Sequence, residues 1–312
     1  MHAAVVRSFG DPPRYESFAA PRPAGDHEAV VQVLAAGLHP RVRSQANGSH
    51  YTSSGDLPLV PGVDGVARTP DGQLRYFVLE DTTMGAMAEQ TVIDLRRSVV
   101  LPEGADPVAI AAATNPAMSS WVALRRRISF EPGQSVLVLG ATGNAGRLAV
   151  QVAKYLGASH VIGAGRQPEK LAALAGLGAG VTVTLDSGEL AKAAADVDVV
   201  IDYLWGPPTA EAMAAVVTAR TDRAQPLSWI EIGSMAGTTA SIPSAALRAA
   251  RLQIVGSGQG SVPTRDIVAE LSDLAAAITS GAFQVDARAV PLSDVAGAWE
   301  DTSSHQRIVI VP

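Results

Sequence analysis

A glycine-rich turn between an apolar run and a helical pattern carries the clearest chemical signal in the sequence. The apolar run covers 136–139, the turn covers 140–146, and apolar residues then recur at helical spacing up to Leu156. A helix that begins at such a turn presents free backbone N–H groups and the positive end of its dipole to an anion. The pattern predicts a pyrophosphate-binding turn lined by Ala141, Thr142, Gly143, Asn144, Ala145 and Gly146.

The three-glycine pattern of dinucleotide-binding turns is incomplete here, because Ala141 stands in place of its first glycine. A tight connection between a strand and a helix that holds no ligand would give a similar pattern, and this is the alternative interpretation. A second apolar run at 160–164 follows the predicted helix, so the segment has the length of a βαβ unit. This context favours a dinucleotide site.

The composition limits the class of protein. A chain of 312 residues exceeds the size at which one core keeps growing, so two domains are expected. No apolar run is long enough to span a bilayer, and the first residues show no signal-peptide pattern, so we expect a cytoplasmic protein. The absence of cysteine excludes disulfides and cysteine nucleophiles. A net charge of −6 argues against a nucleic-acid surface.

The order of the predicted elements gives the fold class. Short strands and turns fill the first third of the chain, with a strong turn signal at 69–72. Strands are then predicted at 136–139, 160–164, 181–185, 197–203, 227–232 and 253–257, alternating with helices at 147–156, 168–176, 209–218, 243–251 and 265–280. Such alternation predicts an α/β protein with a doubly wound parallel sheet that binds its ligand at the carboxyl ends of the strands.

Six segments spread over the chain match the motifs of one superfamily. Residues 85–89, for example, are similar to a Gly-Ala-Tyr-Ala-Glu turn, and the other segments are 33–38, 59–65, 140–146, 197–202 and 307–312. With them the chain resembles the medium-chain dehydrogenase/reductase superfamily, and within it the zinc-independent quinone oxidoreductase (zeta-crystallin-like) branch. The resemblance implies a GroES-like irregular β-barrel catalytic domain over 1–114 and 284–312. It also implies a Rossmann domain that binds NADP over 115–283.

The chain departs from the zinc-dependent members of this superfamily. At the positions of their Cys, His and Cys ligands it carries His39, Val63 and Pro116. An open catalytic zinc site needs three protein donors, so we expect neither zinc nor another metal. Residues 69–84 also form a shorter segment than the family has, which changes the loops that the resemblance places around the substrate.

The residue at the end of the second predicted strand indicates which nicotinamide dinucleotide, NAD or NADP, the site prefers. Sites that prefer NAD carry an acidic residue there for the ribose 2′-OH, whereas this chain carries Arg166. A guanidinium can bind a 2′-phosphate through two hydrogen bonds. By the resemblance, Lys170 matches a lysine that binds the same phosphate in quinone reductases. We therefore expect NADPH or NADP as the cofactor; the alternative is that Arg166 and Lys170 are solvated surface charges.

The resemblance also implies the residues around the reacting end of the cofactor. Most lie at the carboxyl ends of predicted strands, and the cofactor contacts are Ser119, Tyr203, Leu204, Ile232, Gly233, Ser257, Gly258 and Gln259. Three further residues are expected to contact the substrate: Arg43, Asn115 and Trp205.

Two residues of the first domain are candidates for proton transfer to the substrate. His39 carries an imidazole, which exchanges protons near neutral pH, and Tyr51 offers a phenol donor. Each has a structural alternative: His39 caps backbone groups before Pro40, Arg43 lies on a solvated face, and Tyr51 is half-buried in a loop. Asp64 is expected to stabilise its glycine-rich turn. The remaining histidines are expected to be structural or exposed: His2, His27, His50, His160 and His305.

Together these features predict a zinc-free, NADPH-dependent oxidoreductase that transfers hydride to a quinone or an α,β-unsaturated carbonyl. A zinc-free alcohol dehydrogenase or carbonyl reductase is one alternative, with His39 or Tyr51 as the proton relay. An NADPH-binding structural or sensing protein with little turnover is another. The family also implies a homodimer formed through the outer strand at 253–257. Hydrolases of two common kinds are disfavoured, because neither Gly-x-Ser-x-Gly nor His-Glu-x-x-His occurs.

Overall fold

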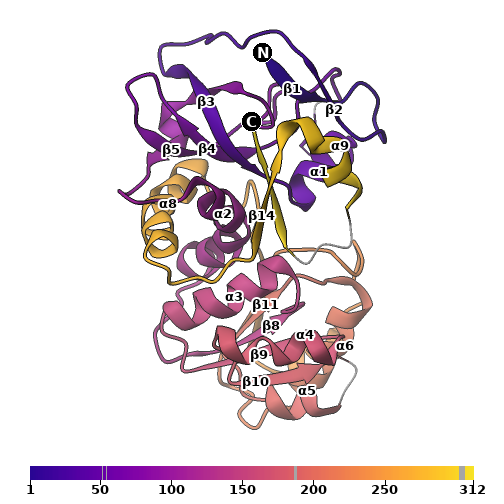
Figure 1. Cartoon of the computed structure of the whole chain (residues 1–312). Coiled ribbons are helices and arrows are strands. Elements are labelled where there is room, and N and C mark those ends of the chain that lie inside the picture. Colours follow the sequence, from indigo (N-terminus) through magenta and orange to yellow (C-terminus); the bar gives the residue numbers. More distant parts are fainter. Residues whose placement is uncertain (51, 54, 186–187, 302–305) are drawn as a thin grey trace. The chain divides into compact units, whose positions relative to one another are not determined.

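The computed structural model covers residues 1–312 and describes all of them except 51, 54, 186–187 and 302–305 (Figure 1). The chain divides into two compact units. The first unit comprises Met1–Asn115, Val268–Gly281 and Val285–Pro312, and the second comprises Pro116–Ile267 and Ala282–Gln284. The division falls within helices α2 (Pro107–Val122) and α8 (Thr264–Thr279). The boundaries expected from the sequence group 268–281 with the second unit instead, and they stay a prediction.

Parallel strands form the sheet of the second unit. They are β8 (Ser135–Leu139), β9 (His160–Gly165), β10 (Val181–Thr184), β11 (Val199–Asp202), β12 (Leu227–Glu231) and β13 (Leu252–Gly256). Their spatial order is β10-β9-β8-β11-β12-β13, with every neighbouring pair parallel. The chain order reverses at β8, and such switch points hold ligands at the carboxyl ends of the strands. The doubly wound parallel sheet predicted from the sequence is confirmed.

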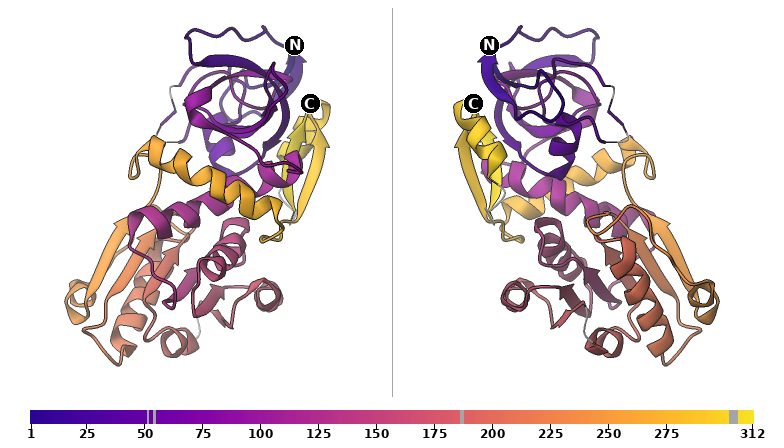
Figure 2. Two further views of the ribbon diagram at one scale, coloured as in Figure 1. Left: turned by 90° about the vertical axis from the view of Figure 1, so that its left-hand side faces the viewer. Right: turned by 90° about the vertical axis from the view of Figure 1, so that its right-hand side faces the viewer.

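Helices flank this sheet (Figure 2). They include α3 (Asn144–Tyr155), α4 (Pro168–Ala172), α5 (Gly188–Ala193), α6 (Gly206–Ala219) and α7 (Ser244–Ala249). Helix α3 is amphipathic and packs its buried side, which includes Leu148 and Val152, against β8 and β9. Helices α5 and α6 bury their apolar side chains with those of the strands in one core, where Met213 and Trp229 are fully buried.

One predicted helix of this unit ends earlier in the structure, and helix α2 ends in an unusual turn. The predicted helix at 168–176 is shorter, because α4 gives way to a 3₁₀ turn, Ala175–Leu177, that contains Gly176 and ends at the left-handed Gly178. Glycine disfavours helix interiors, which accounts for the early end. Helix α2 continues into a single π-helical turn, Ala123–Arg127, that carries three arginines.

The first unit is built around a mostly antiparallel sheet. Its strands are β3 (Glu28–Gly37), β4 (Asp64–Arg68), β5 (Leu74–Val78), β6 (Gln90–Asp94), β7 (Ser98–Val100), β14 (Ala287–Pro291) and β15 (Arg307–Val311). The order is β14-β15-β3-β4-β5-β7, and β6 pairs with the other end of β3. The carboxyl-terminal strand β15 pairs with β3 at Gly37 and Val309, and this places the last strand of the chain in one sheet with strands of the first third.

Smaller elements complete the first unit. Strands β1 (His2–Val5) and β2 (Arg14–Ser17) form a separate antiparallel pair. Helix α1 (Pro40–Ala46) follows β3, while α9 (Val295–Glu300), preceded by the 3₁₀ turn Leu292–Asp294, connects β14 to β15. The core beneath these elements contains Val31, Val42, Phe77, Met87 and Ile310. No described helix is long and apolar enough to cross a membrane.

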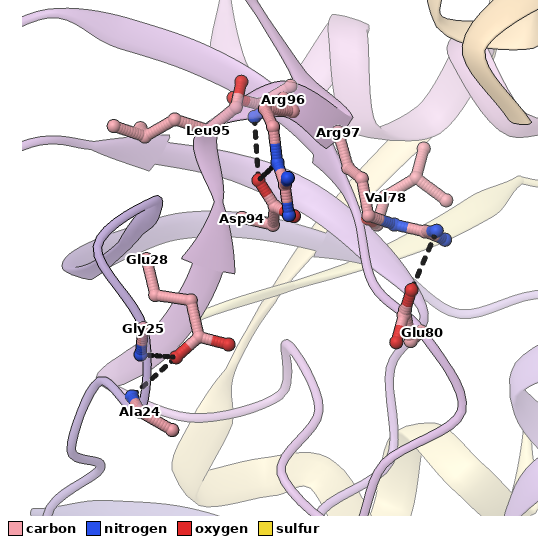
Figure 3. A network of polar contacts seen from close by, with 10 residues as sticks. Ala24, Gly25, Glu28, Val78, Glu80, Asp94, Leu95, Arg96 and Arg97 are labelled. Atoms are coloured by element: carbon pink, nitrogen blue, oxygen red, sulfur yellow. Dashed lines mark hydrogen bonds and ion pairs between the residues drawn. The ribbon is translucent and has the colours of Figure 1, made fainter.

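Polar contacts at the surface of the first unit tie the end of β6 to neighbouring loops (Figure 3). Asp94 accepts hydrogen bonds from the backbone and side chain of Arg96 and caps the 3₁₀ turn Leu95–Arg97. Arg97 pairs with the exposed Glu80 at 3.1 Å. Exposed ion pairs of this kind contribute little to stability, so this network shapes loops rather than a chemical site.

Candidate functional site

The turn between β8 and α3 leaves the start of a helix open. The backbone N–H groups of Gly140 and Ala141 both donate to the Ala164 carbonyl at the end of β9, at 3.0 and 2.9 Å. Gly143 is the N-cap residue of α3, and no side chain caps this helix of 12 residues. Gly143 and Asn144 are exposed. The first N–H groups of α3 therefore remain available to an anion.

Close packing explains the small residues of this turn. A Cβ at position 146 would lie 2.2 Å from the Gly140 carbonyl oxygen, so glycine is required for α3 to begin this close to β8. A Cβ at position 143 would meet only that same oxygen, at 3.6 Å, which leaves the space in front of the N-cap open. Ala141 is fully buried, and its methyl group lies opposite Gly163. The exposed donors of the turn fit a pyrophosphate.

Two basic side chains follow the neighbouring strand. The end of β9 lies directly against the turn, because a Cβ on Gly165 would come within 2.8 Å of the Thr142 methyl carbon. Arg166 is the next residue and is exposed, and Lys170 lies half-buried in α4. Within the described part of the chain, neither side chain forms an ion pair. No described carboxylate neutralises either cation, so both fit a phosphate beside the turn.

A buried carboxylate fixes the loop at the end of β11. Asp202 is fully buried and accepts four hydrogen bonds: from the backbone N–H groups of Leu204 and Trp205, from Thr209 Oγ1 at 2.6 Å and from Trp229 Nε1 at 3.0 Å. Trp205 has a φ of 50°, which makes it the one non-glycine residue in the left-handed region among those described. This strain needs a strong local constraint, and Asp202 supplies it. Sequence reasoning named Leu204 and Trp205 but missed Asp202.

The structure brings most of the predicted cofactor residues to one edge of the sheet. The N–H groups of Ile232 and Gly233 donate to the Asp202 carbonyl at 2.8 and 3.2 Å, and the Ser257 N–H donates to the Glu231 carbonyl at 2.8 Å. A Cβ on Gly140 would lie 3.1 Å from Leu204 Cδ2, so the phosphate turn and the β11 loop are also neighbours. Gly258 and Gln259 continue from Ser257 at the same edge.

Two of the predicted cofactor residues contact each other. The Ser119 hydroxyl donates to the Pro116 carbonyl at 2.7 Å, so the Tyr203 hydroxyl, 2.8 Å away, is the donor in their shared hydrogen bond. Burial raises the pKa of Tyr203 to about 12, against a smaller opposing effect of its bond to Ser119. The Tyr203 phenol therefore stays neutral at physiological pH and acts as a fixed donor.

Glu231, at the same edge of the sheet, is half-buried, and this changes the pKa of its carboxyl group. Desolvation, and then the charge of Asp202, raise the pKa of Glu231. Its carboxylate lies 3.9 Å from the place where a Cβ on Gly256 would be. Sequence reasoning named the segment for its backbone and gave this side chain no role.

In the first unit, the predicted catalytic His39 is buried in a polar cluster. Its Nε2 lies 2.8 Å from Asp64 Oδ1, and the Tyr76 hydroxyl donates to Asp64 Oδ2 at 2.6 Å. His39 is the N-cap residue of α1, but its side chain makes no capping bond. Asp64 was expected to stabilise its own turn; its side chain instead accepts from His39 and Tyr76, which the strands bring to it from other parts of the chain.

The remaining substrate candidates have different surroundings. Arg43 donates to the Trp299 carbonyl at 2.6 Å and lies over the Trp299 ring at 5.1 Å. Burial lowers the pKa of Arg43, against the opposing charge of Asp301. Asn115 and Trp205 are half-buried. Tyr51 lies outside the described residues. The substrate-binding roles of these residues stay predictions.

His50, which the sequence suggested was structural or exposed, belongs to a second polar cluster. Thr52 donates its backbone N–H to His50 Nδ1 at 3.3 Å, and Arg41 contacts both Thr52 and Asp81. Burial and the Arg41 charge lower the pKa of His50, while Asp81 opposes them. No motif marks this cluster, because its members are joined by loop contacts rather than by spacing.

Metal donors are sparse in both units. The described residues contain no group of three or more His, Cys, Asp or Glu side chains that could hold a metal ion. Of the three positions that bind zinc in zinc-dependent relatives, Val63 and Pro116 offer no donor atom, and the His39 Nε2 is directed at Asp64.

Comparison with known proteins identifies the family. A family profile described as zinc-binding dehydrogenase matches residues 145–277. The chain is 32% identical to a probable NADPH-dependent quinone reductase of Emericella nidulans, over 100% of both chains. The chain belongs to the quinone oxidoreductase branch of the medium-chain dehydrogenase/reductase superfamily. The membership predicted from the sequence is thereby confirmed.

Other members of this branch support the assignment. The human quinone oxidoreductase is 31% identical over 168 residues, which cover 50% of each chain. Among solved structures, the quinone oxidoreductase of Thermus thermophilus has a TM-score of 0.79 at 24% identity, and that of Pseudomonas syringae has 0.81 at 23%. Both comparisons cover 100% of each chain and show that the fold is shared.

The four bonds to Asp202 lead to a prediction. We expect Asp202→Asn to lower the free energy of unfolding by roughly 1–3 kcal/mol, because an amide cannot accept all four hydrogen bonds and leaves a buried donor unpaired. Urea unfolding monitored by circular dichroism measures the change. Asp196→Asn is the matched control, since Asp196 is exposed and accepts hydrogen bonds from Thr221 without burying its carboxylate. Equal stability of the two variants would contradict the prediction.

Proposed function

We propose that this protein is an NADPH-dependent oxidoreductase that reduces quinones or α,β-unsaturated carbonyl compounds. The observation that carries the proposal is the uncapped start of α3, with Arg166 exposed at the end of the adjacent strand β9. The Emericella nidulans relative is described as NADPH-dependent and as a quinone reductase, which supports both parts of the proposal. The cytoplasmic location expected from the sequence stays a prediction.

The second unit supplies the cofactor contacts. When bound, NADPH supplies a hydride for the reduction. The N–H groups at residues 141–146 would hold the pyrophosphate, and Arg166 with Lys170 would hold the 2′-phosphate. The nicotinamide half would contact the edge formed by Ser119, Tyr203, Leu204, Ile232, Gly233, Ser257, Gly258 and Gln259. Side chains with fixed hydrogen bonds at this edge, such as Tyr203, orient the ring without chemistry of their own.

Most of the candidate substrate contacts belong to the first unit, and Trp205 belongs to the second. Charge that develops on the substrate oxygen needs a hydrogen-bond donor, and His39 and Tyr51 are our candidates. Arg43, Asn115 and Trp205 would contact the rest of the substrate. A conjugated acceptor spreads the developing charge over several atoms, so it suits hydrogen-bond donors better than a simple ketone does. Two of the three positions equivalent to zinc ligands have no donor atom, which supports a metal-free reaction.

The edge strand β13 supports a homodimer. It ends the sheet at the side opposite β10, and Leu252, Ile254 and Val255 on it are half-buried. An open apolar edge invites pairing with another strand. We propose that two copies pair their β13 strands in antiparallel fashion, as the family resemblance implies.

A substrate panel tests the reaction. We expect NADPH absorbance to fall with quinones and enones and to stay constant with simple ketones, with the same rates before and after treatment with a chelator. Turnover of simple ketones alone would replace the proposal with a carbonyl reductase. Tight NADPH binding without turnover of any acceptor would replace it with a nucleotide-binding protein.

Cofactor choice is tested at Arg166. We expect Arg166→Ala to weaken NADPH binding about 10-fold to 100-fold, because a hydrogen bond between charged groups contributes roughly 1.5–3 kcal/mol. NADH binding should not change, since NADH has no 2′-phosphate. Titration calorimetry with both nucleotides gives the two affinities. Arg265→Ala removes an equally charged, 87% exposed side chain elsewhere and serves as the control. An equal loss for both nucleotides would count against the assigned role.

The dimer is tested on β13. We expect Gln253→Lys to shift the particle mass from twice 32.1 kDa to the single-chain value, because lysines on an edge strand oppose strand pairing. Light scattering after size-exclusion chromatography measures the mass. Thr218→Lys adds the same charge on an exposed position of α6 and should leave the dimer intact. A wild-type protein that elutes as a monomer would refute the proposal.

A further inference from the structure

His39 belongs to a buried cluster in which Asp64 contacts His39 through one carboxylate oxygen and Tyr76 through the other. His39, Asp64 and Tyr76 are 3%, 1% and 0% exposed. Asp64 Oδ1 lies 2.8 Å from His39 Nε2, while Asp64 Oδ2 accepts from the Tyr76 hydroxyl at 2.6 Å. Both carboxylate oxygens therefore have a partner. Each link is short enough for a strong hydrogen bond to an ionised acceptor.

The backbone around the cluster is fixed by strand pairing. Asp64 begins β4 and Tyr76 lies on β5, and these strands pair with Val66 opposite Tyr76. The residue before His39 is held on both sides, because the Leu38 N–H donates to Ile308 at 2.9 Å and its carbonyl accepts from Arg307 Nη1 at 3.2 Å. The imidazole therefore has little freedom to turn away from Asp64.

The hydrogen bond to Asp64 then determines which ring nitrogen of His39 carries the hydrogen. An ionised carboxylate only accepts hydrogen bonds, so the hydrogen must be on His39 Nε2. The other nitrogen, Nδ1, is buried and has no hydrogen-bond partner among the described residues. An unpaired polar atom in a buried side chain is costly, and Nδ1 is the one ring nitrogen of His39 that is left for a further hydrogen bond.

We propose that Asp64 and Tyr76 are positioning residues that hold His39 so that its Nδ1 passes a proton to the oxygen of the substrate. The proposal rests on the proposed function, in which a conjugated carbonyl compound is reduced. Asp64 stabilises the imidazolium and fixes its orientation. Tyr76 holds the far oxygen of Asp64 and so keeps the carboxylate in the plane that His39 requires.

In an unsaturated carbonyl compound, the proton from His39 neutralises the charge that hydride addition places on the oxygen. Hydride adds to the β-carbon, the C=C electron pair shifts toward the carbonyl, and the oxygen gains negative charge. The Nδ1–H bond of the imidazolium breaks and an O–H bond forms, giving an enol that returns to the carbonyl form in water. In a quinone, the hydride, which carries two electrons and one hydrogen, and the proton from Nδ1 together produce the hydroquinone. The Nε2–H group of His39 stays hydrogen-bonded to Asp64 throughout. Water then returns a proton to Nδ1.

The charges that face His39 set the direction of its pH response. Asp64 on β4 favours the imidazolium, whereas Arg307 on β15 opposes it and Tyr76 on β5 withdraws part of the Asp64 charge. Burial lowers the pKa of Arg307 to about 10, with Asp64 opposing this, so the guanidinium remains charged at neutral pH. Loss of the imidazolium as pH rises should therefore slow reduction, giving a descending limb in kcat/KM against pH.

Two variants should move that limb in opposite directions. Asp64→Asn removes the carboxylate charge beside His39, so the limb should shift to lower pH. Tyr76→Phe removes the second donor to Asp64, so the limb should shift to higher pH. His39→Asn should remove the limb and lower kcat/KM by about 100-fold or more. The controls Asp196→Asn and Tyr155→Phe change exposed residues and should leave the limb in place.

A spectroscopic measurement tests the geometry without turnover. Nitrogen-15 NMR of histidine-labelled protein, with the His39 signals identified by their loss in His39→Asn, should show the hydrogen on Nε2 above the limb. A hydrogen on Nδ1 in the neutral ring would overturn the proposal, as would limbs that coincide in wild type, Asp64→Asn and Tyr76→Phe. Variants that fail to fold, as judged by circular dichroism, leave the wild-type NMR result to decide. Wild-type protein that oxidises no NADPH with any acceptor refutes the proposed function instead.

Discussion

The candidate cofactor site of the second unit depends on the first backbone N–H groups of α3, which the fold leaves without partners. Buried or packed polar groups of the main chain are nearly always paired, yet α3 begins with no side-chain cap at an exposed glycine. This arrangement requires a strand that ends in a tight turn and a helix that starts almost in contact with it, which is why Gly146 cannot carry a Cβ. The parallel sheet then brings the loops after β11, β12 and β13 to the same edge, where a long ligand can meet all of them.

Each unit also contains a buried carboxylate that fixes the groups around it. Asp202 ends β11 and Asp64 begins β4, and both are almost fully shielded from water. Each accepts a hydrogen bond from an aromatic side chain on the neighbouring strand, Trp229 in one case and Tyr76 in the other. A buried charge is tolerated only when its acceptor sites are filled, so each carboxylate forces specific donors into place. Asp202 uses that requirement to shape a loop, and Asp64 uses it to orient an imidazole.

Local features of the sequence predicted the second unit well, because they depend on neighbours along the chain. The turn at 140–146, the alternation of strands and helices, and the position of Arg166 all follow from residues a few positions apart. Contacts between distant residues were not predictable in this way. Tyr203 meets Ser119 across 84 positions and Arg43 meets Trp299 across 256, and no periodicity encodes either pair. The role of Asp64 was mistaken for the same reason, since Tyr76 reaches it only through the register of β4 and β5.

The residue at position 39 bears on the chemistry of this site, because His39 stands where the resemblance places a zinc ligand and contacts Asp64 instead. The family resemblance equates this position with a zinc-binding thiolate of zinc-dependent relatives, in which a metal meets the developing charge on the substrate oxygen. An imidazole bonded to Asp64 through Nε2 has only Nδ1 left, and no second or third donor stands at Val63 or Pro116. A single nitrogen without further ligands is poorly suited to hold a catalytic metal, but it is sufficient to move a proton. By our proposal, this backbone position therefore carries proton chemistry in place of Lewis-acid chemistry, through one residue and the carboxylate that holds it.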